Sequence, residues 1–169
     1  MTTTLRGERV TLRPLEESDR SRVVEILEEP EVARWFGTES AEESADEFIS
    51  DPEVTGLAIE AVGVLIGVIG FYEEDTPDYR HAGMDLFLAT ESQDQGLGRE
   101  ALRLLARHLF EERGHHRLVI DPAASNARAI RAYEAVGFKP VGIMRLYERG
   151  LDGTFHDGLL MDLLAEELR

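Results

Sequence analysis

The stretch SQDQGLGREAL, residues 92–102, places Gly96 and Gly98 where a helical pattern begins. Glycine disfavours a helix interior by about 1 kcal/mol relative to alanine, so two glycines at a helix start need a reason. The first helical turn leaves N–H groups unpaired and carries partial positive charge, which suits a phosphate group. Glycines leave these amides open to an anion. The stretch predicts a phosphate-binding helix start, with a tight strand–helix turn as the alternative.

Hydrophobic periodicity predicts the elements on either side of this helix. We expect strands at residues 9–15, 56–62, 64–74, 82–90, 116–122, 138–150 and 155–163, and helices at residues 19–29, 40–50, 96–114 and 125–137. Ser18 is the expected N-cap of the first helix, and Pro30 is expected to end it. The order β-α-α-β-β-β-α-β-α-β-β indicates an α/β fold with a mixed sheet, and the length predicts one domain over residues 1–169.

Acidic residues dominate the charge and are unevenly distributed. The chain has 34 acidic and 18 basic residues, a net charge of −16. Residues 1–80 hold 20 acidic and 7 basic residues, so they carry −13 of this charge. One interpretation of this excess is solubility and acid-rich helix faces. The other interpretation is that the N-terminal half binds a cationic ligand. Without a basic stripe to meet phosphates, we expect no nucleic-acid partner.

The composition also argues against several kinds of chemistry and against a membrane location. The sequence has no cysteine, which rules out disulfides, cysteine metal ligands and an acyl-cysteine intermediate. The first residues show no signal-peptide pattern and the apolar runs are short, so we expect a cytoplasmic chain without a membrane partner. His115 and His116 adjoin a helix end without further ligand residues, and we expect no metal.

The glycine pair belongs to the longer pattern Gln93-x-x-Gly96-x-Gly98. It is not a P-loop, because no Lys-Ser/Thr pair follows, and it is not the dinucleotide fingerprint, because Ala101 stands where that motif has its third glycine. A second segment, IDPAASNARAIRAYEAVGF at residues 120–138, places Asn126 and Tyr133 on one helix face.

Together the two segments resemble the GNAT acetyltransferases, which have a Q/R-x-x-G-x-G/A loop followed by N-x-x-A-x-x-x-Y-e-x-x-G-F. The resemblance implies a single α/β domain with a mixed, mostly antiparallel central sheet, flanked by helices and containing a splayed strand pair. It also implies that the strand before the loop bulges. Acetyl-CoA is the implied co-substrate. The implied cofactor-binding residues are Leu86, Phe87, Leu88, Gln93, Gln95, Gly96, Leu97, Gly98, Arg99, Asn126 and Tyr133.

The resemblance narrows to the aminoglycoside 6′-N-acetyltransferases through the segments ARWFG, GMDLFLA and IDPAASN. It implies that Trp35, Asp85 and Asp121 bind a small polycationic amine, most closely the 6′-amine of an aminoglycoside, which would confer antibiotic resistance. It also implies catalytic roles for Asp85, Asp121 and Tyr133, with Tyr133 as general acid. We favour Asp85 over Asp121 as general base. The acidic Asp94 must point away from a phosphate site in this loop.

Two other interpretations are compatible with the sequence. The same cofactor motifs occur in acetyltransferases of polyamines, siderophore amines and protein N-termini, and residues 38–80 carry little that resembles the aminoglycoside enzymes. A CoA-binding regulatory domain without turnover is the second alternative, and the presence of both Asp85 and Tyr133 argues against it. The sequence is compatible with a monomer or a homodimer.

Overall fold

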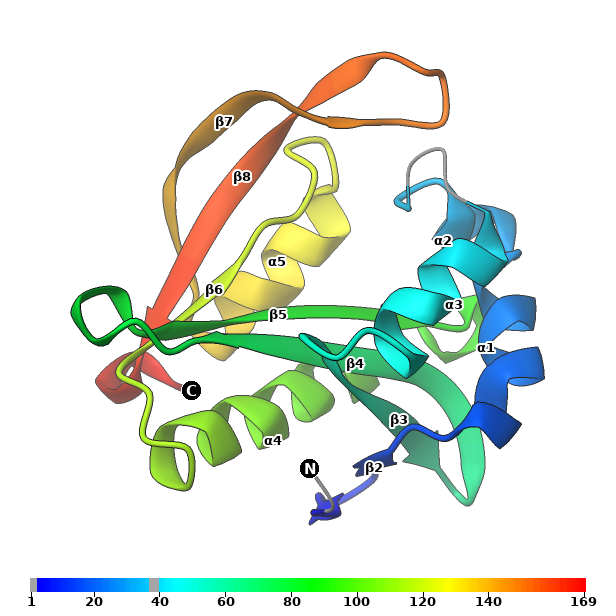
Figure 1. The fold of residues 1–169 in the computed structure, drawn as a ribbon, viewed down its shortest axis with the longest axis horizontal. Helices are drawn as coiled ribbons and strands as arrows, with labels where there is room; N and C mark the ends of the chain where they lie inside the picture. Colours follow the sequence, from blue (N-terminus) through cyan, green and yellow to red (C-terminus); the bar gives the residue numbers. More distant parts are fainter. Residues whose placement is uncertain (1–2, 37–39) are drawn as a thin grey trace.

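The computed structural model describes residues 3–36 and 40–169 of the chain (Figure 1). The strands are β1 (Leu5–Arg6), β2 (Thr11–Pro14), β3 (Thr55–Ala61), β4 (Val64–Glu74), β5 (His81–Leu88), β6 (Arg117–Ile120), β7 (Lys139–Arg149) and β8 (Phe155–Leu164). The helices are α1 (Arg20–Leu27), α2 (Pro30–Ala33), α3 (Ala41–Ile49), α4 (Leu97–Glu111) and α5 (Ala127–Val136).

The described strands form one eight-stranded sheet with the order β1-β2-β3-β4-β5-β6-β8-β7. Neighbouring strands are antiparallel, apart from the parallel pair β5 and β6. The predicted mixed, mostly antiparallel α/β fold is therefore confirmed. β1, a strand of two residues, was missed because it is too short to show alternation.

The parallel strands β5 and β6 pair at Ala82 with Leu118 and at Gly83 with Val119. Beyond this point β5 continues to Leu88, β6 ends at Ile120, and the two strands part (Figure 1). The splayed pair is thus present. The expected bulge in β5 is not: its register with β4 is continuous from His81 to Leu88, so the opening arises from divergence alone.

Two helical layers cover the sheet and enclose two hydrophobic clusters. Buried residues of α4 and α5 pack with Met84, Leu118 and Ile120 on one face. Buried residues of α1 and α3 pack with Val68 and Phe87 on the other face. Since side chains alternate between faces along a strand, β5 directs Met84 toward α4 and α5 and directs Phe87 toward α1 and α3.

Sequence reasoning misjudged the first helical segment. Ser18 is not the N-cap of α1, because residues Glu17–Asp19 form a short 3₁₀ turn and Asp19 precedes the helix. Pro30 does not only end a helix: it is the first residue of α2, where its missing N–H costs nothing. The next segment includes Gly37 of the ARWFG motif, and this residue lies outside the described residues.

Other local features of the structure have the form that their residue types favour. The β3–β4 hairpin turns at Val62 and Gly63, both with positive φ as a type I′ turn requires. The Asn126 side chain caps α5 by accepting the Ala129 N–H at 3.2 Å, and Gly137 ends the helix in a left-handed conformation. The last segment is a strand through Leu164, paired with both β6 and β7.

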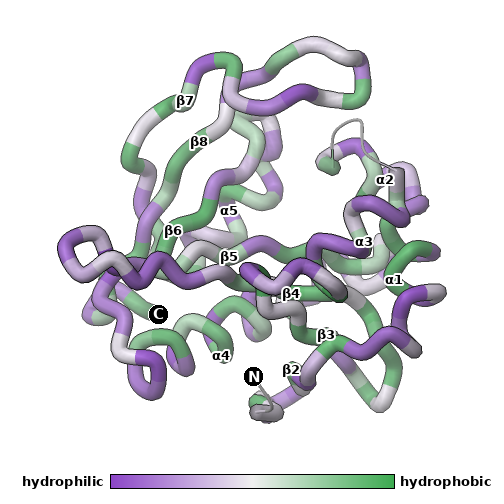
Figure 2. Tube along the Cα trace, in the orientation of Figure 1, coloured by the Kyte–Doolittle hydropathy of each residue, from purple (hydrophilic) through white to green (hydrophobic). Residues whose placement is uncertain are grey.

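The hydropathy of the residues differs between connections and strands (Figure 2). The β4–β5 connection is hydrophilic, whereas hydrophobic residues continue along β6 toward the centre of the sheet. Among the described residues, no helix is long and apolar enough to span a membrane.

Gly137 gives a test of the fold. Its φ is +118°, and a Cβ would collide with the carbonyl oxygen of Glu167. We expect Gly137→Ala to lower the free energy of unfolding by about 1–3 kcal/mol, measured by urea denaturation. Gly142→Ala is the control, since nothing lies within 4 Å of its Cβ position. Equal stability of the two variants would contradict the described end of α5.

Candidate active site

A cavity of about 740 Å³ opens where β5 and β6 part. It extends from α2 and α3 on one side of the sheet to the N-termini of α4 and α5 on the other side. The sequence-predicted residues that line it are Trp35, Asp85, Leu86, Phe87, Leu88, Gln93, Gly96, Gly98, Arg99, Asp121, Asn126 and Tyr133. Gln95 and Leu97 are not in this lining: Gln95 Nε2 donates to the Glu91 carbonyl, and the Leu97 side chain packs in the core.

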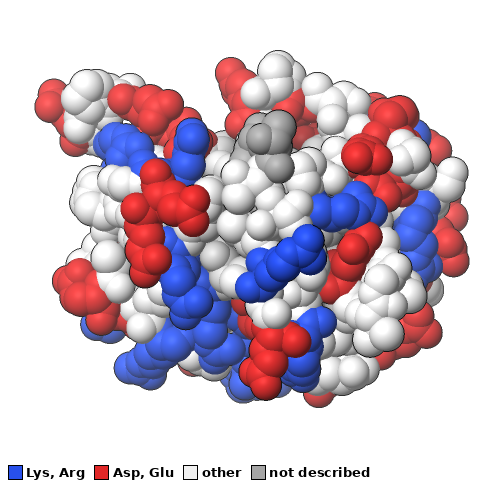
Figure 3. All heavy atoms as spheres, turned by 90° about the horizontal axis from the view of Figure 1, so that it is seen from below, with Lys and Arg blue, Asp and Glu red and all other residues white. Residues whose placement is uncertain are grey.

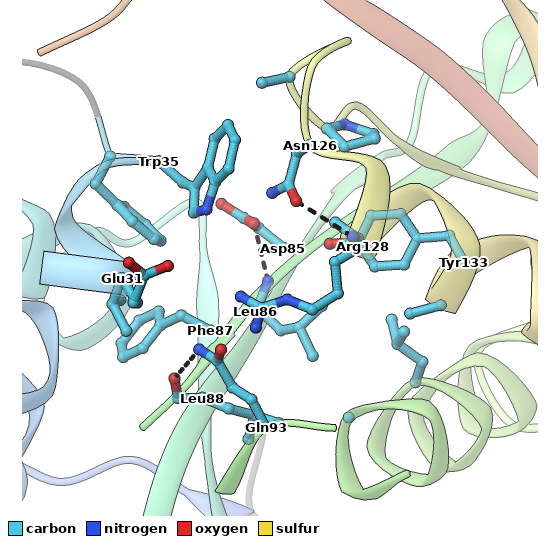
Figure 4. A pocket seen from close by; sticks show the side chains of 18 of the residues that line it. Glu31, Trp35, Asp85, Leu86, Phe87, Leu88, Gln93, Asn126, Arg128 and Tyr133 are labelled. Carbon is cyan, nitrogen blue, oxygen red and sulfur yellow. Dashed lines mark hydrogen bonds between the residues drawn. The ribbon is translucent and has the colours of Figure 1, made fainter. Parts of the chain in front are cut away.

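The parted edge of β5 presents backbone groups to the cavity. Ala89 N–H donates to the Ile66 carbonyl on β4 at 2.8 Å. Because N–H groups alternate in direction along a strand, those of Leu86 and Leu88 point away from β4, toward the opening. Leu86 N–H donates to the Asp85 carboxylate at 2.9 Å, as Figure 4 shows.

The N-terminus of α4 is open toward the cavity. Its N-cap, Gly96, has φ +78° and provides no side chain to bond the first-turn amides. Glu100 lies in this turn, but its carboxylate accepts the N–H groups of Arg9 and Val10 at 2.6 and 3.0 Å. The helix end therefore keeps its positive potential on the cavity side.

Gln93 and Asn126 lie on opposite sides of this opening (Figure 4). Gln93 Nε2 donates to the Leu88 carbonyl at 3.0 Å, while its Oε1 is buried without a hydrogen-bond partner among the described residues. An unpaired buried acceptor costs free energy that a ligand N–H would recover. Asp94 is exposed but lines the cavity, contrary to the expectation that it points away from the site, and its carboxylate lies 3.6 Å from Arg128 Nη1.

Asp85 is the most perturbed carboxylate of the cavity. Its side chain is open to the cavity, but the surrounding walls remove bulk solvent, and this desolvation raises its pKa to about 7. Repulsion from Asp121, Glu47 and Glu148 adds to the rise, and the bond from Leu86 N–H opposes it. Asp85 can therefore exchange a proton near neutral pH.

Tyr133 lies on α5. Its side chain is buried among core residues and also forms part of the cavity wall (Figure 4). Burial raises the pKa of its hydroxyl well above the usual range, and the charges of Asp85 and Asp121 raise it further. The hydroxyl therefore stays protonated at neutral pH and can act as a proton donor.

Further acidic residues of the lining were missed by sequence reasoning. Glu31 on α2, Glu47 on α3 and Glu148 on β7 all face the cavity. For Glu31 and Glu47 the only signal was the acidity of residues 1–80, which does not single out any position, and no signal pointed to Glu148. Arg128 and Arg131 on α5 also line the cavity, at the end formed by the two helix N-termini.

Charge on the outer surface is mixed. On the face seen from below in Figure 3, basic side chains lie in the lower and central part, and acidic side chains occur among and around them. The cavity lining also contains both signs of charge, with the carboxylates Glu31, Glu47, Asp85, Asp94, Asp121 and Glu148 and the arginines Arg99, Arg128, Arg131 and Arg149.

A sheet that parts beside two helix N-termini, with a glycine-bounded amide turn and a buried tyrosine, is the arrangement of an acyl-CoA-dependent transferase. The chain matches the family described as "Acetyltransferase (GNAT) domain" over residues 9–139 and therefore belongs to the GNAT acetyltransferase family. The resemblance inferred from the sequence is confirmed.

Individual relatives divide between two kinds of acceptor. Aminoglycoside N(6′)-acetyltransferase type 1 of Klebsiella pneumoniae is 32% identical over 153 residues, which cover 79% of this chain and 75% of that protein. YdaF of Bacillus subtilis (strain 168), provisionally named a ribosomal N-acetyltransferase, is 28% identical over 95% of this chain and 94% of its own. The solved structure of AAC(6′)-Ib in complex with ribostamycin and coenzyme A has a TM-score of 0.77 and 26% identity, covering 95% and 96% of the two chains.

Proposed function

We propose that this chain transfers the acetyl group of acetyl-CoA to a primary amine of a small polycationic acceptor, with the 6′-amine of an aminoglycoside as the leading candidate. One observation carries the proposal. The cavity lining combines the carboxylates Asp85, Asp121 and Glu148 with the open N-terminus of α4 and Arg128. Such a lining can bind a cationic acceptor through its carboxylates and an anionic donor through its amides and arginines.

The donor end fits acetyl-CoA. The uncapped amides of α4 and the side chains of Arg99, Arg128 and Arg131 offer donors to the pyrophosphate. The buried Oε1 of Gln93 fits an amide N–H of the pantetheine arm. Solved relatives are described in complex with coenzyme A or acetyl-CoA. Acetyl-CoA supplies an activated acetyl thioester, and the chain's own residues do the rest.

Transfer forms a C–N bond, breaks the thioester C–S bond and moves two protons. Asp85, ionised above pH 7, accepts the proton that the amine loses. The Leu86 N–H is already bonded to Asp85, so the N–H group of Leu88, which also faces the opening, donates to the carbonyl oxygen as it gains charge. Tyr133 donates its hydroxyl proton to the departing thiolate and regains one from solvent.

The acceptor end favours a molecule with several ammonium groups. Trp35 gives an apolar wall on which a sugar ring can stack. The carboxylates of the cavity lining can bind the ammonium groups of such an acceptor. The relative from Klebsiella pneumoniae and AAC(6′)-Ib carry aminoglycoside acetylation in their names, which supports this acceptor class. We further propose that the chain acts in the cytoplasm and protects a bacterium from the antibiotic.

A protein N-terminus is the alternative acceptor, supported by the ribosomal assignment of YdaF. A polyamine or siderophore amine would suit the same carboxylates. A CoA-binding domain without turnover is the remaining possibility, and it leaves the proton-transfer pair Asp85 and Tyr133 without a use.

A CoA-release assay with acetyl-CoA and a panel of aminoglycosides, polyamines and N-terminal peptides tests the function. We expect turnover with 6′-amino aminoglycosides and none with analogues that bear a 6′-hydroxyl. A bacterium that expresses the chain should tolerate only the former group better. Equal turnover of both groups excludes the 6′-amine, and no turnover of any aminoglycoside moves the assignment to the other acceptors.

The donor site is tested at Gly98 rather than Gly96, because Gly96 has φ +78° and any substitution there strains the backbone. A Cβ at Gly98 would lie 3.3 Å from Leu88 Cδ1, a flexible side-chain end. We expect Gly98→Val to fold and to weaken acetyl-CoA binding by about tenfold or more, measured by calorimetry. Gly142→Val is the matched control. Unchanged affinity in folded Gly98→Val would leave tight packing as the reason for the glycines.

The pH dependence tests the base. Because Asp85 must be ionised to accept a proton, kcat/KM should rise with pH and level off above about 7. Asp85→Asn should lose this limb and about 100-fold or more in kcat. Asp121→Asn should keep the limb but move it to lower pH, since the Asp121 charge helps to raise the pKa of Asp85. An identical limb in Asp85→Asn would remove this residue as the base.

A further inference from the structure

A bulge in β7 lies beside the acceptor end of the cavity. The β7–β8 register breaks between Met144 and Glu148, so that residues 145–147 lie opposite Asp157. Leu146 has φ +48°, which is unfavourable for a residue with a bulky side chain. Its N–H donates to Asp157 Oδ1 at 2.8 Å. The strained conformation is therefore held by a specific bond from β8.

Asp157 also ties this bulge to the chain that follows β6. Its carbonyl accepts the Ala124 N–H at 2.9 Å, and Leu159 N–H donates to the Pro122 carbonyl at 2.9 Å. β8 thus lies between the bulge and the segment that carries Asp121.

Tyr147, the last residue of the bulge, connects the two directly. Its hydroxyl donates to Asp121 Oδ2 at 2.7 Å, and this bond raises the pKa of Tyr147 to about 12. Its ring lies over Gly158, where a Cβ would be only 2.9 Å from ring atom Cδ2. The residue is 49% exposed, so core packing is not what fixes the ring. The missing side chain at Gly158 and the bond to Asp121 set its position.

The bulge also turns the next residue, Glu148, into the cavity lining. Burial raises the pKa of Glu148, and the charge of Asp121 raises it further. Glu148 and Asp121 both act electrostatically on Asp85. Carboxylates that repel one another in a partly desolvated space are stabilised by a cation.

We propose that Tyr147 is a positioning residue that orients Asp121, and that Asp121 and Glu148 form a second ammonium subsite next to Asp85. This inference rests on the proposed function and deepens it. The acceptor then needs two amines: one reacts beside Asp85, and another binds at Asp121 and Glu148. An acceptor with a single amine fills only the reactive position.

Two acceptors that share the reacting group test the subsite. Kanamycin A carries a 6′-amine and further amines, whereas 6-amino-6-deoxyglucose carries one amine. In both Tyr147→Phe and Glu148→Gln, we expect KM for kanamycin A to rise about tenfold with kcat changed less than about twofold. All rates are measured above the pH limb, where Asp85 is ionised in every variant, and there the kcat/KM for 6-amino-6-deoxyglucose should change less than about twofold. Equal losses with both acceptors, or no loss with kanamycin A, overturn the subsite.

Matched substitutions outside the cavity lining control for general effects. Tyr79→Phe changes a tyrosine that is 75% exposed, and Glu111→Gln changes a carboxylate at the end of α4. Both should leave the two acceptors unaffected. A shift of the same size in either control overturns the assignment to Tyr147 and Glu148.

The positioning role has a readout that needs no acceptor. Removing both members of one hydrogen bond should change the melting temperature less than the sum of the two single changes, so Tyr147→Phe and Asp121→Ala should be non-additive. Additive shifts overturn the role of Tyr147. If neither sugar is acetylated, the proposed function fails, and calorimetric binding of kanamycin A to the same variants replaces KM. Equal binding by wild type and variants then overturns the subsite.

Discussion

The parting of β5 and β6 is the constraint on which the rest of this molecule depends. The strands pair at Ala82 and Gly83 and then diverge, leaving one edge of β5 unpaired with a strand. Unpaired backbone groups inside a sheet are costly unless a ligand or a side chain bonds them. Asp85 meets part of that need by bonding its neighbour's N–H, and the slot left open joins the two faces of the sheet.

This opening brings together two sets of side chains that the chain otherwise keeps apart. Helices α4 and α5 belong to one core cluster and direct their N-termini at the slot, while α1 and α3 belong to the other. In the proposed function, the donor therefore meets peptide dipoles and arginines, and the acceptor meets carboxylates. Desolvation of Asp85, together with repulsion from the neighbouring carboxylates, raises its pKa to about 7.

The sequence was informative where local chemistry decides the structure. The glycines of α4, the Asn126 cap and Gly137 each meet a backbone demand that is legible in a few residues. The sequence was uninformative where the position of a side chain depends on how its strand or helix packs with distant segments. Glu148 faces the cavity because of a register shift against β8, and Glu31 does so because Pro30 begins a second short helix. Side-chain alternation along β7 does not reveal a bulge, since most of that strand is exposed on both faces.

The location of β7 at the rim of the sheet affects how such an enzyme can diversify. Core residues such as Leu105 and Met161 are fully enclosed, so replacing them disturbs the packing of several elements. Val141, Ile143 and Leu146 on β7 are more than half exposed, and replacing them removes little buried area. The proposed acceptor subsite thus depends on Tyr147 and Glu148 on a strand whose other residues can be exchanged with little loss of buried area. Substitutions along β7 can therefore alter the proposed acceptor subsite with little effect on the stability of the fold.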